Sequence, residues 1–297
     1  MTRGLAVLAA LTSLLQGPQP LFRSGTDLVR VDALVLRDGK PVTGLGADDF
    51  EVRDNGVLQQ VTAAATADAV HLALTLDASG SMTPERLQLS RAAAEHVVGQ
   101  LTGHDRFDVF AFNDQVALIG DSRRPASALS ETLARVQAGG STALVDAAYT
   151  SIVHGAAGGG PTLLLLMTDG RNNNSFLRAQ DAIDAARRHE TAIYPVAVEM
   201  DRRWDRTVVW PHLRTSDSLA LLRLLADETG GQLIEARWDA RLPDVFARIL
   251  AEYRQRYIVT FTPEGVGRND GWHRIEVKLR RGKGTVRART RYWAGAL

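Results

Sequence analysis

The polar sequence Asp-Ala-Ser-Gly-Ser, which begins at Asp77, interrupts the chain where an apolar run from His71 to Leu76 stops. The run is typical of a buried strand. A helix is expected to begin near Pro84, because the missing N–H of proline is no loss in the first turn of a helix. In the tight turn between them, the carboxylate of Asp77 and the hydroxyls of Ser79 and Ser81 project to one side. Such a convergence of oxygens is typical of a site for a hard cation.

Two later stretches supply further oxygens. The segment from Gly139 to Thr142 opens a helix, and Asp169 follows the most apolar strand of the chain, Thr162 to Met167. Between residues 70 and 256, runs typical of strands alternate with runs typical of helices, which predicts an α/β fold with a mostly parallel sheet covered by helices on both faces. Because the carboxyl ends of parallel strands lie at one edge, we expect the three polar stretches to meet there.

Both ends of the chain have the alternating apolar pattern of β-strands instead. Residues 28–66 contain such runs and the turn Asp54-Asn55-Gly56, which is typical of a hairpin, and three more runs follow Tyr257. A few strands are rarely stable alone, so we expect the two ends to assemble into one small β-sandwich with the α/β domain inserted between them. The predicted limits are 25–68 and 257–297 for the two halves of the sandwich and 69–256 for the inserted domain.

The three polar stretches resemble the metal-ion-dependent adhesion site of von Willebrand factor type A domains, whose pattern is Asp-x-Ser-x-Ser, then a threonine, then an aspartate. All five positions are filled, by Asp77, Ser79, Ser81, Thr142 and Asp169. The resemblance implies a Rossmann-like, doubly wound sheet for the inserted domain. The flanks are similar to those of a related family of bacterial secreted proteins, in the segments Gly44-Leu45, Asp49 to Val52, Asp54 to Gly56, Tyr257 to Pro263 and Val286 to Tyr292.

In the resembling family, the residues at Ser79, Ser81 and Thr142 bind the ion directly, and those at Asp77 and Asp169 often act through water. Neutral hydroxyls leave much of the charge of a dication uncompensated, so an open coordination position favours a carboxylate from another molecule. Octahedral, partly hydrated coordination suits Mg2+, with Mn2+ as a substitute. The resemblance thus implies a metal-dependent adhesion or interaction module whose protein partner supplies an aspartate or glutamate side chain.

Residues expected near the same sheet edge are candidates for contact with that partner. Asn172 and Asn173 closely follow Asp169 and offer oxygen ligands or hydrogen bonds, although polar runs between elements are most often plain loop. Trp204 and Trp210 lie in a long segment after the fifth strand of the domain. Aromatic residues on a rim can anchor a partner, and the two tryptophans are equally compatible with a lid folded onto their own domain.

Two other functions remain open. A metal-dependent hydrolase would use the open position of the ion to polarise a phosphoryl or carbonyl oxygen, and a scaffold would hold a purely structural ion. Against an enzyme, the sequence lacks a Gly-x-Ser-x-Gly turn, a His-Glu-x-x-His run and a Gly-x-x-x-x-Gly-Lys phosphate-binding loop. No general base is evident beside the polar turns. We therefore predict that the chain is not an enzyme.

The N-terminus predicts export. Arg3 precedes an apolar run from Gly4 to Leu15, and the helix breakers Gly17 and Pro18 follow. The run is shorter than the ~20 residues of a membrane-spanning helix, and its basic start is typical of a secretory signal. We predict a signal peptide over residues 1–20, no stable membrane span after its cleavage, and a periplasmic or extracellular location. A buried or amphipathic N-terminal helix is the alternative.

The charge balance gives no sign of a nucleic-acid partner. The 297 residues carry 35 Lys and Arg against 34 Asp and Glu, a formal net charge of +1, so there is no overall attraction to a polyanion. Arg287, Arg289 and Arg291 alternate along the last predicted strand, and a solvated outer face is the simplest explanation for them. The chain contains no cysteine, which excludes disulfides, a thiol nucleophile and zinc-thiolate sites.

Overall fold

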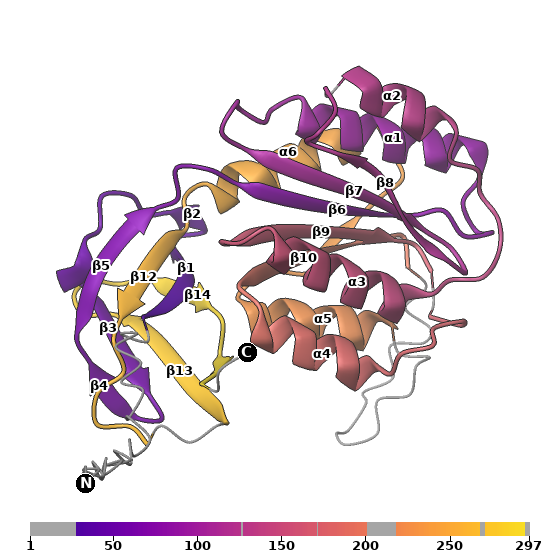
Figure 1. Ribbon diagram of the computed structural model, residues 1–297. Helices are drawn as coiled ribbons and strands as arrows, with labels where there is room; N and C mark the ends of the chain where they lie inside the picture. The colour runs from indigo at the N-terminus through magenta and orange to yellow at the C-terminus, as the bar shows by residue number, and fades with distance from the viewer. Residues whose placement is uncertain (1–27, 126, 171, 201–217, 268–270, 295–297) are drawn as a thin grey trace, which may run out of the picture.

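The computed structural model describes residues 28–125, 127–170, 172–200, 218–267 and 271–294. The predicted signal peptide, Trp204 and Trp210 lie outside these ranges. Within them, the strands form sheets of six, five and four strands, and helices flank the six-stranded sheet (Figure 1). None of the helices in these ranges is long and apolar enough to cross a bilayer.

The six-stranded sheet has the order β11-β10-β9-β6-β7-β8. All neighbouring strands are parallel except β7 and β8. The strands are β6 (His71–Asp77), β7 (Arg106–Phe112), β8 (Val116–Asp121), β9 (Thr162–Thr168), β10 (Thr191–Val198) and β11 (Ile234–Ala236). β6, β9 and β10 are buried along their whole length, as expected for a parallel sheet covered on both faces.

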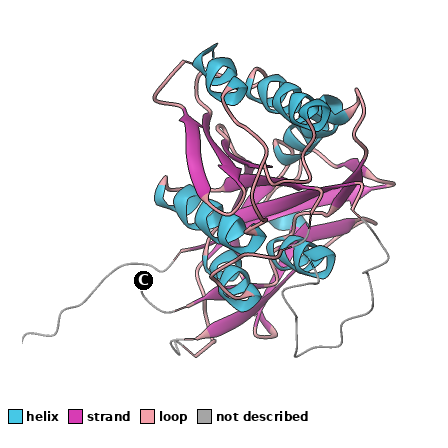
Figure 2. Ribbon diagram, turned by 90° about the vertical axis from the view of Figure 1, so that its right-hand side faces the viewer, coloured by secondary structure: helices cyan, strands magenta, loops and turns pink. Residues whose placement is uncertain are grey.

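Helices cover the two faces of this sheet in two groups, and Figure 2 shows the strands between them. One face carries α1 (Pro84–Val98), α2 (Ser127–Ala134) and α6 (Leu242–Tyr253), and the other carries α3 (Leu144–Ala157), α4 (Ala179–Arg188) and α5 (Ser218–Thr229). Leu72, Leu74 and Leu76 of β6 pack in the core of the first group, and Ala73 packs in the core of the second. This alternation follows from the two-residue period of a strand.

The two ends of the chain form the other sheets. One has the order β14-β1-β12-β5, with β2 paired to β1, and the other has the order β15-β13-β3-β4. The strands are β1 (Val29–Arg37), β2 (Lys40–Pro41), β3 (Phe50–Asp54), β4 (Val57–Gln59), β5 (Val61–Thr66), β12 (Tyr257–Phe261), β13 (Trp272–Leu279), β14 (Thr285–Ala288) and β15 (Arg291–Trp293), and a 3-10 helix, Ala47–Asp49, precedes β3. Side chains of both sheets form one separate core. The limits of the two domains, 25–68 with 257–297 for the sandwich and 69–256 for the inserted domain, stay a prediction.

The last predicted strand differs from the structure. Residues 286–292 do not form one strand, because β14 ends at Ala288 in one sheet and β15 begins at Arg291 in the other. Arg289, in the crossing between them, is 8% exposed rather than solvated, and its guanidinium donates to the main-chain oxygens of Arg187 and Arg291. The sequence pattern missed this change because the residues continue to alternate where the chain passes from one sheet to the other.

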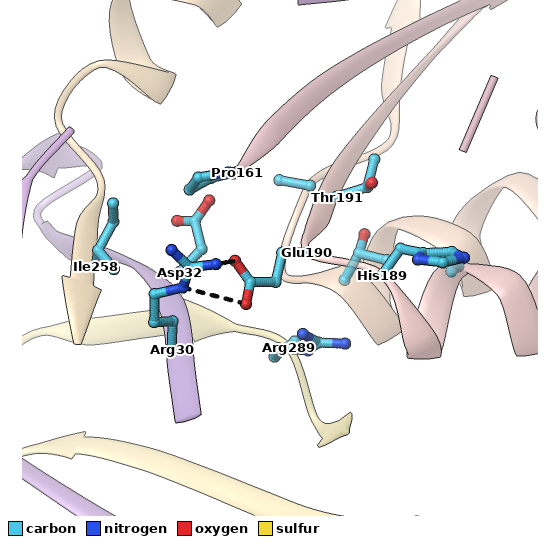
Figure 3. Close-up of a pocket in the computed structure, with 11 residues that line it drawn as sticks. Arg30, Asp32, Pro161, His189, Glu190, Thr191, Ile258 and Arg289 are labelled. Atoms are coloured by element: carbon cyan, nitrogen blue, oxygen red, sulfur yellow. Dashed lines mark hydrogen bonds and ion pairs between the residues drawn. The ribbon is translucent and has the colours of Figure 1, made fainter. Parts of the chain in front are cut away.

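The β-sandwich lies at the amino ends of the parallel strands (Figure 1). Arg30 of β1 forms an ion pair at 3.2 Å with Glu190, which immediately precedes β10 (Figure 3). Arg256, just before β12, is 3% exposed and pairs with Asp32 of β1, while its Nη1 donates to the Tyr194 hydroxyl of β10 at 3.1 Å. The carboxyl ends of the parallel strands therefore face away from the sandwich.

Asp105 joins three separate segments of the α/β domain. Its buried carboxylate accepts hydrogen bonds from Val70 N at 2.7 Å, Thr102 N at 2.6 Å and Arg254 Nη2 at 2.6 Å. Burial favours the protonated acid, but the hydrogen bonds from Arg254, Thr102 and Val70 outweigh it and lower the pKa of Asp105 from 3.8 to about 2. The carboxylate therefore stabilises the folded state at neutral pH.

The stabilisation of the folded state by Asp105 is expected to decrease as the pH falls. Because the pKa is lower in the folded state, the stabilisation is complete above about pH 5 and is lost as the pH falls toward about 2. Between these two pH values, the free energy of unfolding of the wild type is expected to fall by about 2 kcal/mol more than that of Asp105→Asn. Urea unfolding at both pH values measures this difference, and an equal fall in the two proteins would contradict the assignment.

Candidate metal centre

The three polar stretches meet at the carboxyl edge of the six-stranded sheet. Asp77 is the last residue of β6 and Asp169 follows β9, and these two strands are adjacent and parallel. Thr142 lies two residues before α3. Its loop is joined to the first polar turn by a main-chain hydrogen bond from Gly80 N to Gly140 O at 3.0 Å. The sheet topology and this bond bring the three loops together.

Gly140 is required by this junction. Its φ is 74°, in the left-handed region that glycine adopts without strain. A Cβ at this position would lie 2.3 Å from Asp114 Oδ1. A side chain here would therefore displace the exposed Asp114 side chain and would hold the backbone in a strained, left-handed conformation.

Oxygens of the first turn and of Asp169 are in direct contact. Ser79 Oγ and Ser81 Oγ are 3.2 Å apart, and the Ser81 hydroxyl donates to Asp169 Oδ1 at 2.6 Å. Asp77 accepts hydrogen bonds from Ser79 N at 2.8 Å and from the Thr168 hydroxyl at 2.6 Å. The structure thus places four of the five expected site residues in one hydrogen-bonded cluster.

Thr142, the fifth expected residue, lies against the same cluster. It is 5% exposed, and a Cβ on Gly170 would lie 3.5 Å from Thr142 Oγ1 and 3.6 Å from Asp77 Oδ2. These two oxygens therefore flank the same glycine. The main chain of Thr142 is held by Asn173, because Thr142 N donates to Asn173 Oδ1 at 2.7 Å and Asn173 N donates to Thr142 O at 3.0 Å.

The cluster holds carboxylates that are poorly solvated. Burial raises the pKa of the fully buried Asp77, hydrogen bonds from Ser79 and Thr168 oppose this effect, and the charge of Asp169 raises the pKa further. The Asp169 side chain is 3% exposed and forms an ion pair with Arg86 Nη1 at 2.5 Å. Two buried carboxylates so close together favour a nearby cation, because it offsets their repulsion and their loss of solvation.

The chemistry of these donors fits a hard divalent cation. Three hydroxyls and two carboxylates are oxygen ligands of the kind that Mg2+ and Mn2+ take in proteins. In the parts of the chain that the structure describes, no group of three or more His, Cys, Asp or Glu residues is arranged to hold an ion. The serine and threonine hydroxyls therefore distinguish this cluster from a site built of acids and histidines alone.

The residues expected at the rim have different positions. Asn173 lies beside Thr142, whereas Asn172 is only 5% exposed. Asn172 N donates to Ser218 Oγ at 2.7 Å, and its side-chain oxygen accepts from Ser175 Oγ. Asn172 therefore holds its own loop against the start of α5 and is not a surface residue. Trp204 and Trp210, the other two residues predicted for the rim, lie outside the described ranges.

Phe176 is a candidate contact residue that the sequence analysis missed. Its side chain is 99% exposed, whereas the other exposed large apolar side chains of the described residues are between 36% and 54% exposed. Its main chain is nevertheless fixed, because Phe176 N and Leu177 N donate to the Asp146 carboxylate of α3 at 2.9 and 2.8 Å. Phe176 follows Asn173 by three residues, so their Cα atoms are at most about 11 Å apart. The signal in the sequence was an apolar pair within a polar loop.

A doubly wound α/β sheet with hydroxyl and carboxylate oxygens at its carboxyl edge defines the class of this domain. In a comparison with protein families, residues 71–240 match the von Willebrand factor type A domain. The match covers more than half of the chain and the whole six-stranded sheet. The chain belongs to this family, whose domains commonly mediate protein–protein interaction and bind a divalent metal ion.

Two solved structures show the same fold. The von Willebrand factor type A protein from Catenulispora acidiphila matches with a TM-score of 0.51 and 15% identity, over 88% of this chain and 76% of that chain. Proximal thread matrix protein 1 from the mussel byssus matches with a TM-score of 0.50 and 16% identity, over 67% of this chain and 49% of that chain. At these identities the likeness concerns the fold alone. No curated protein matches the chain.

Proposed function

We propose that this chain is a secreted, divalent-metal-dependent protein-binding module that captures an acidic side chain of its partner. Ser79, Ser81 and Thr142 would bind the ion, with Asp77 and Asp169 as further ligands or as partners of its bound waters. Mg2+ is the proposed ion, and Mn2+ is a substitute. The observation that carries the proposal is the convergence of these oxygens from three loops at the sheet edge that faces away from the sandwich.

The residues of the chain have distinct roles in this proposal. When bound, the ion would supply positive charge and a coordination position for an external carboxylate. Asp77 accepts hydrogen bonds from Ser79 N and the Thr168 hydroxyl, and it thereby fixes the turn that carries the serine hydroxyls. Asp169 accepts from the Ser81 hydroxyl and so orients it. The ligands are positioned by contacts within the fold, as is common for metal sites.

A binding module is favoured over a metal-dependent hydrolase because, among the described residues, no histidine is hydrogen-bonded to the cluster. His71 and His154 both contact Asp108, with nitrogen to oxygen distances of 2.7 and 3.4 Å. His71 begins β6 and Asp77 ends it, so these two residues are about 20 Å apart along the strand. This histidine pair therefore belongs to the opposite edge of the sheet and is too far away to activate a nucleophile at the cluster.

Peptide retention on the immobilised protein tests the proposed function. The ligands are peptides of about twelve residues, each with a central Asp. An extended peptide of this length can reach from the cluster to Phe176. The control for each is the same peptide with Asn in place of the central Asp. We expect retention of Asp peptides in Mg2+, loss of retention in EDTA, and no retention of the Asn counterparts. Equal retention of both sets, or retention that persists in EDTA, would contradict the proposal.

Phe176 is expected to be part of the same binding surface. Its side chain packs on nothing in the described structure, so Phe176→Ala should leave the melting temperature unchanged. It should weaken retention of the Asp peptides about tenfold, the effect typical of an aromatic anchor. Leu58→Ala is the control, because Leu58 is also an exposed apolar residue, at 54%, but lies in β4 of the sandwich. Unchanged peptide affinity in Phe176→Ala would exclude Phe176 from the contact surface.

A further inference from the structure

Arg86 places a permanent positive charge within the proposed metal centre. It lies in the first turn of α1, directly after the serine-containing turn. Its Nη1 donates to Asp169 Oδ2 at 2.5 Å and to Ser81 O at 3.1 Å. The Arg86 side chain is 32% exposed, whereas that of Asp169 is 3% exposed. The guanidinium therefore contacts a buried carboxylate of the site and also reaches solvent.

The position of Arg86 is supported from two sides. Its main-chain N–H donates to the Thr83 hydroxyl at 3.3 Å, which caps α1. Its Cζ lies 5.6 Å from the centre of the Trp238 ring, a distance at which an arginine and a tryptophan attract each other. Trp238 itself packs against the core beneath α1 and α6. The guanidinium is thus held between Trp238 and Asp169.

Counting formal charges shows what Arg86 does to the site. The carboxylates of Asp77 and Asp169 would exactly balance a dication if they were the only charges. Arg86 adds one positive charge at hydrogen-bond distance from Asp169, so the occupied site would carry one net positive charge. Like charges repel, which weakens binding of the ion, and the same excess attracts an anion. Since the Asp169 carboxylate is shielded from water, salt screens this effect only in part.

We propose that Arg86 couples the metal ion and the acidic ligand, so that each binds weakly without the other. This inference rests on the proposed function. Arg86 lowers the affinity of the site for the ion alone, and it raises the affinity of the loaded site for a carboxylate. By thermodynamic reciprocity, the factor by which the bound ion raises the affinity for a carboxylate is also the factor by which a carboxylate raises the affinity for the ion. Release of the ion in the absence of a partner is the functional consequence.

Mn2+ binding, followed by electron paramagnetic resonance, tests this coupling without any protein partner. Acetate serves as the carboxylate probe, and chloride at equal ionic strength is the reference. In the wild type, acetate is expected to tighten Mn2+ binding. Arg86→Gln removes the charge but keeps a polar side chain of similar length. It should bind Mn2+ about 5- to 50-fold more tightly in chloride and should lose most of the acetate effect.

Two further variants separate charge from packing. Arg86→Lys keeps the charge and should behave like the wild type in both buffers. Arg123→Gln removes an arginine that is 83% exposed and pairs with Asp121, and it should change neither affinity. Wild-type or weaker Mn2+ affinity in Arg86→Gln, in a protein that melts normally, would overturn the role of Arg86 alone. Absence of Mn2+ binding in the wild type would overturn the proposed function as well.

Discussion

Asp77→Asn is expected to weaken Mg2+ binding about 100-fold, the upper part of the range for residues that support a metal site. The substitution hardly changes the size of the side chain, but it removes one of the two carboxylate charges from the cluster. The Asp77 carboxylate accepts hydrogen bonds from Ser79 N and from the Thr168 hydroxyl. In the Asn variant, an amide N–H2 group replaces one of the two accepting oxygens and faces one of these donors. Both changes disturb the turn that presents the serine hydroxyls. Calorimetric titration with Mg2+ measures the loss.

The melting temperature provides a second measure of the same effect. An ion that binds only the folded protein stabilises it by mass action, so Mg2+ should raise the melting temperature of the wild type and have no effect on Asp77→Asn. Asp121→Asn is the matched control, because Asp121 ends the edge strand β8 and pairs with Arg123 at 2.5 Å. A wild-type response to Mg2+ in Asp77→Asn would show that this carboxylate does not support an ion.

Arg256→Met is expected to lower the free energy of unfolding by about 3–5 kcal/mol, the usual result of removing one member of a buried ion pair. Arg256 is 3% exposed, and the substitution leaves the Asp32 carboxylate without its cation. It also leaves Gly230 O without the donor that now lies at 2.8 Å. Burial opposes the charge of Arg256, but the nearby Asp32 carboxylate raises the pKa of Arg256 above its ordinary value. Arg256 is therefore charged at every accessible pH.

Urea unfolding measures the effect of Arg256→Met. Arg30→Met is the control, because the Arg30–Glu190 pair links the same two parts of the molecule but its side chains are 46% and 30% exposed. Such a pair contributes at most about 1 kcal/mol. The Mg2+ affinity of folded Arg256→Met should be unchanged, since the metal centre lies at the other end of the sheet. A loss below about 1 kcal/mol for Arg256→Met would contradict the role of the buried pair.

Much of the fold could be predicted because its signals are local. The apolar run that ends at Asp77 is a fully buried strand, and Pro84 begins the helix that follows. The hairpin predicted at Asp54-Asn55-Gly56 connects β3 and β4, with φ of 46° for Asn55 and 85° for Gly56. The change of sheet between β14 and β15 was missed, because it depends on tertiary packing around Arg289 and not on the local pattern.

The candidate site was predictable only in part. Asp77 and Asp169 could be expected to lie close together, because Asp77 ends one apolar strand of the parallel sheet and Asp169 follows another. The contact between Arg86 and Asp169 could not, since it depends on side-chain conformation and on Trp238, which is remote in sequence. Asn172 was placed on the rim because it closely follows Asp169, but it is buried and hydrogen-bonded to Ser175 of its own loop and to Ser218 of α5. The apolar pair Phe176-Leu177 stands out in a polar loop, but the pattern does not say which of the two is exposed: Leu177 packs against the core and Phe176 does not.

The most direct test of the metal centre is an anomalous difference map from crystals grown with Mn2+. We expect one peak at the carboxyl edge of the six-stranded sheet, at about 2.0–2.3 Å from the hydroxyl oxygens of Ser79, Ser81 and Thr142. Asp77 and Asp169 should lie beside the peak or contact its bound waters. A map with no peak there, at an Mn2+ concentration that saturates binding in solution, or with Thr142 Oγ1 turned away from the serines, would contradict the account.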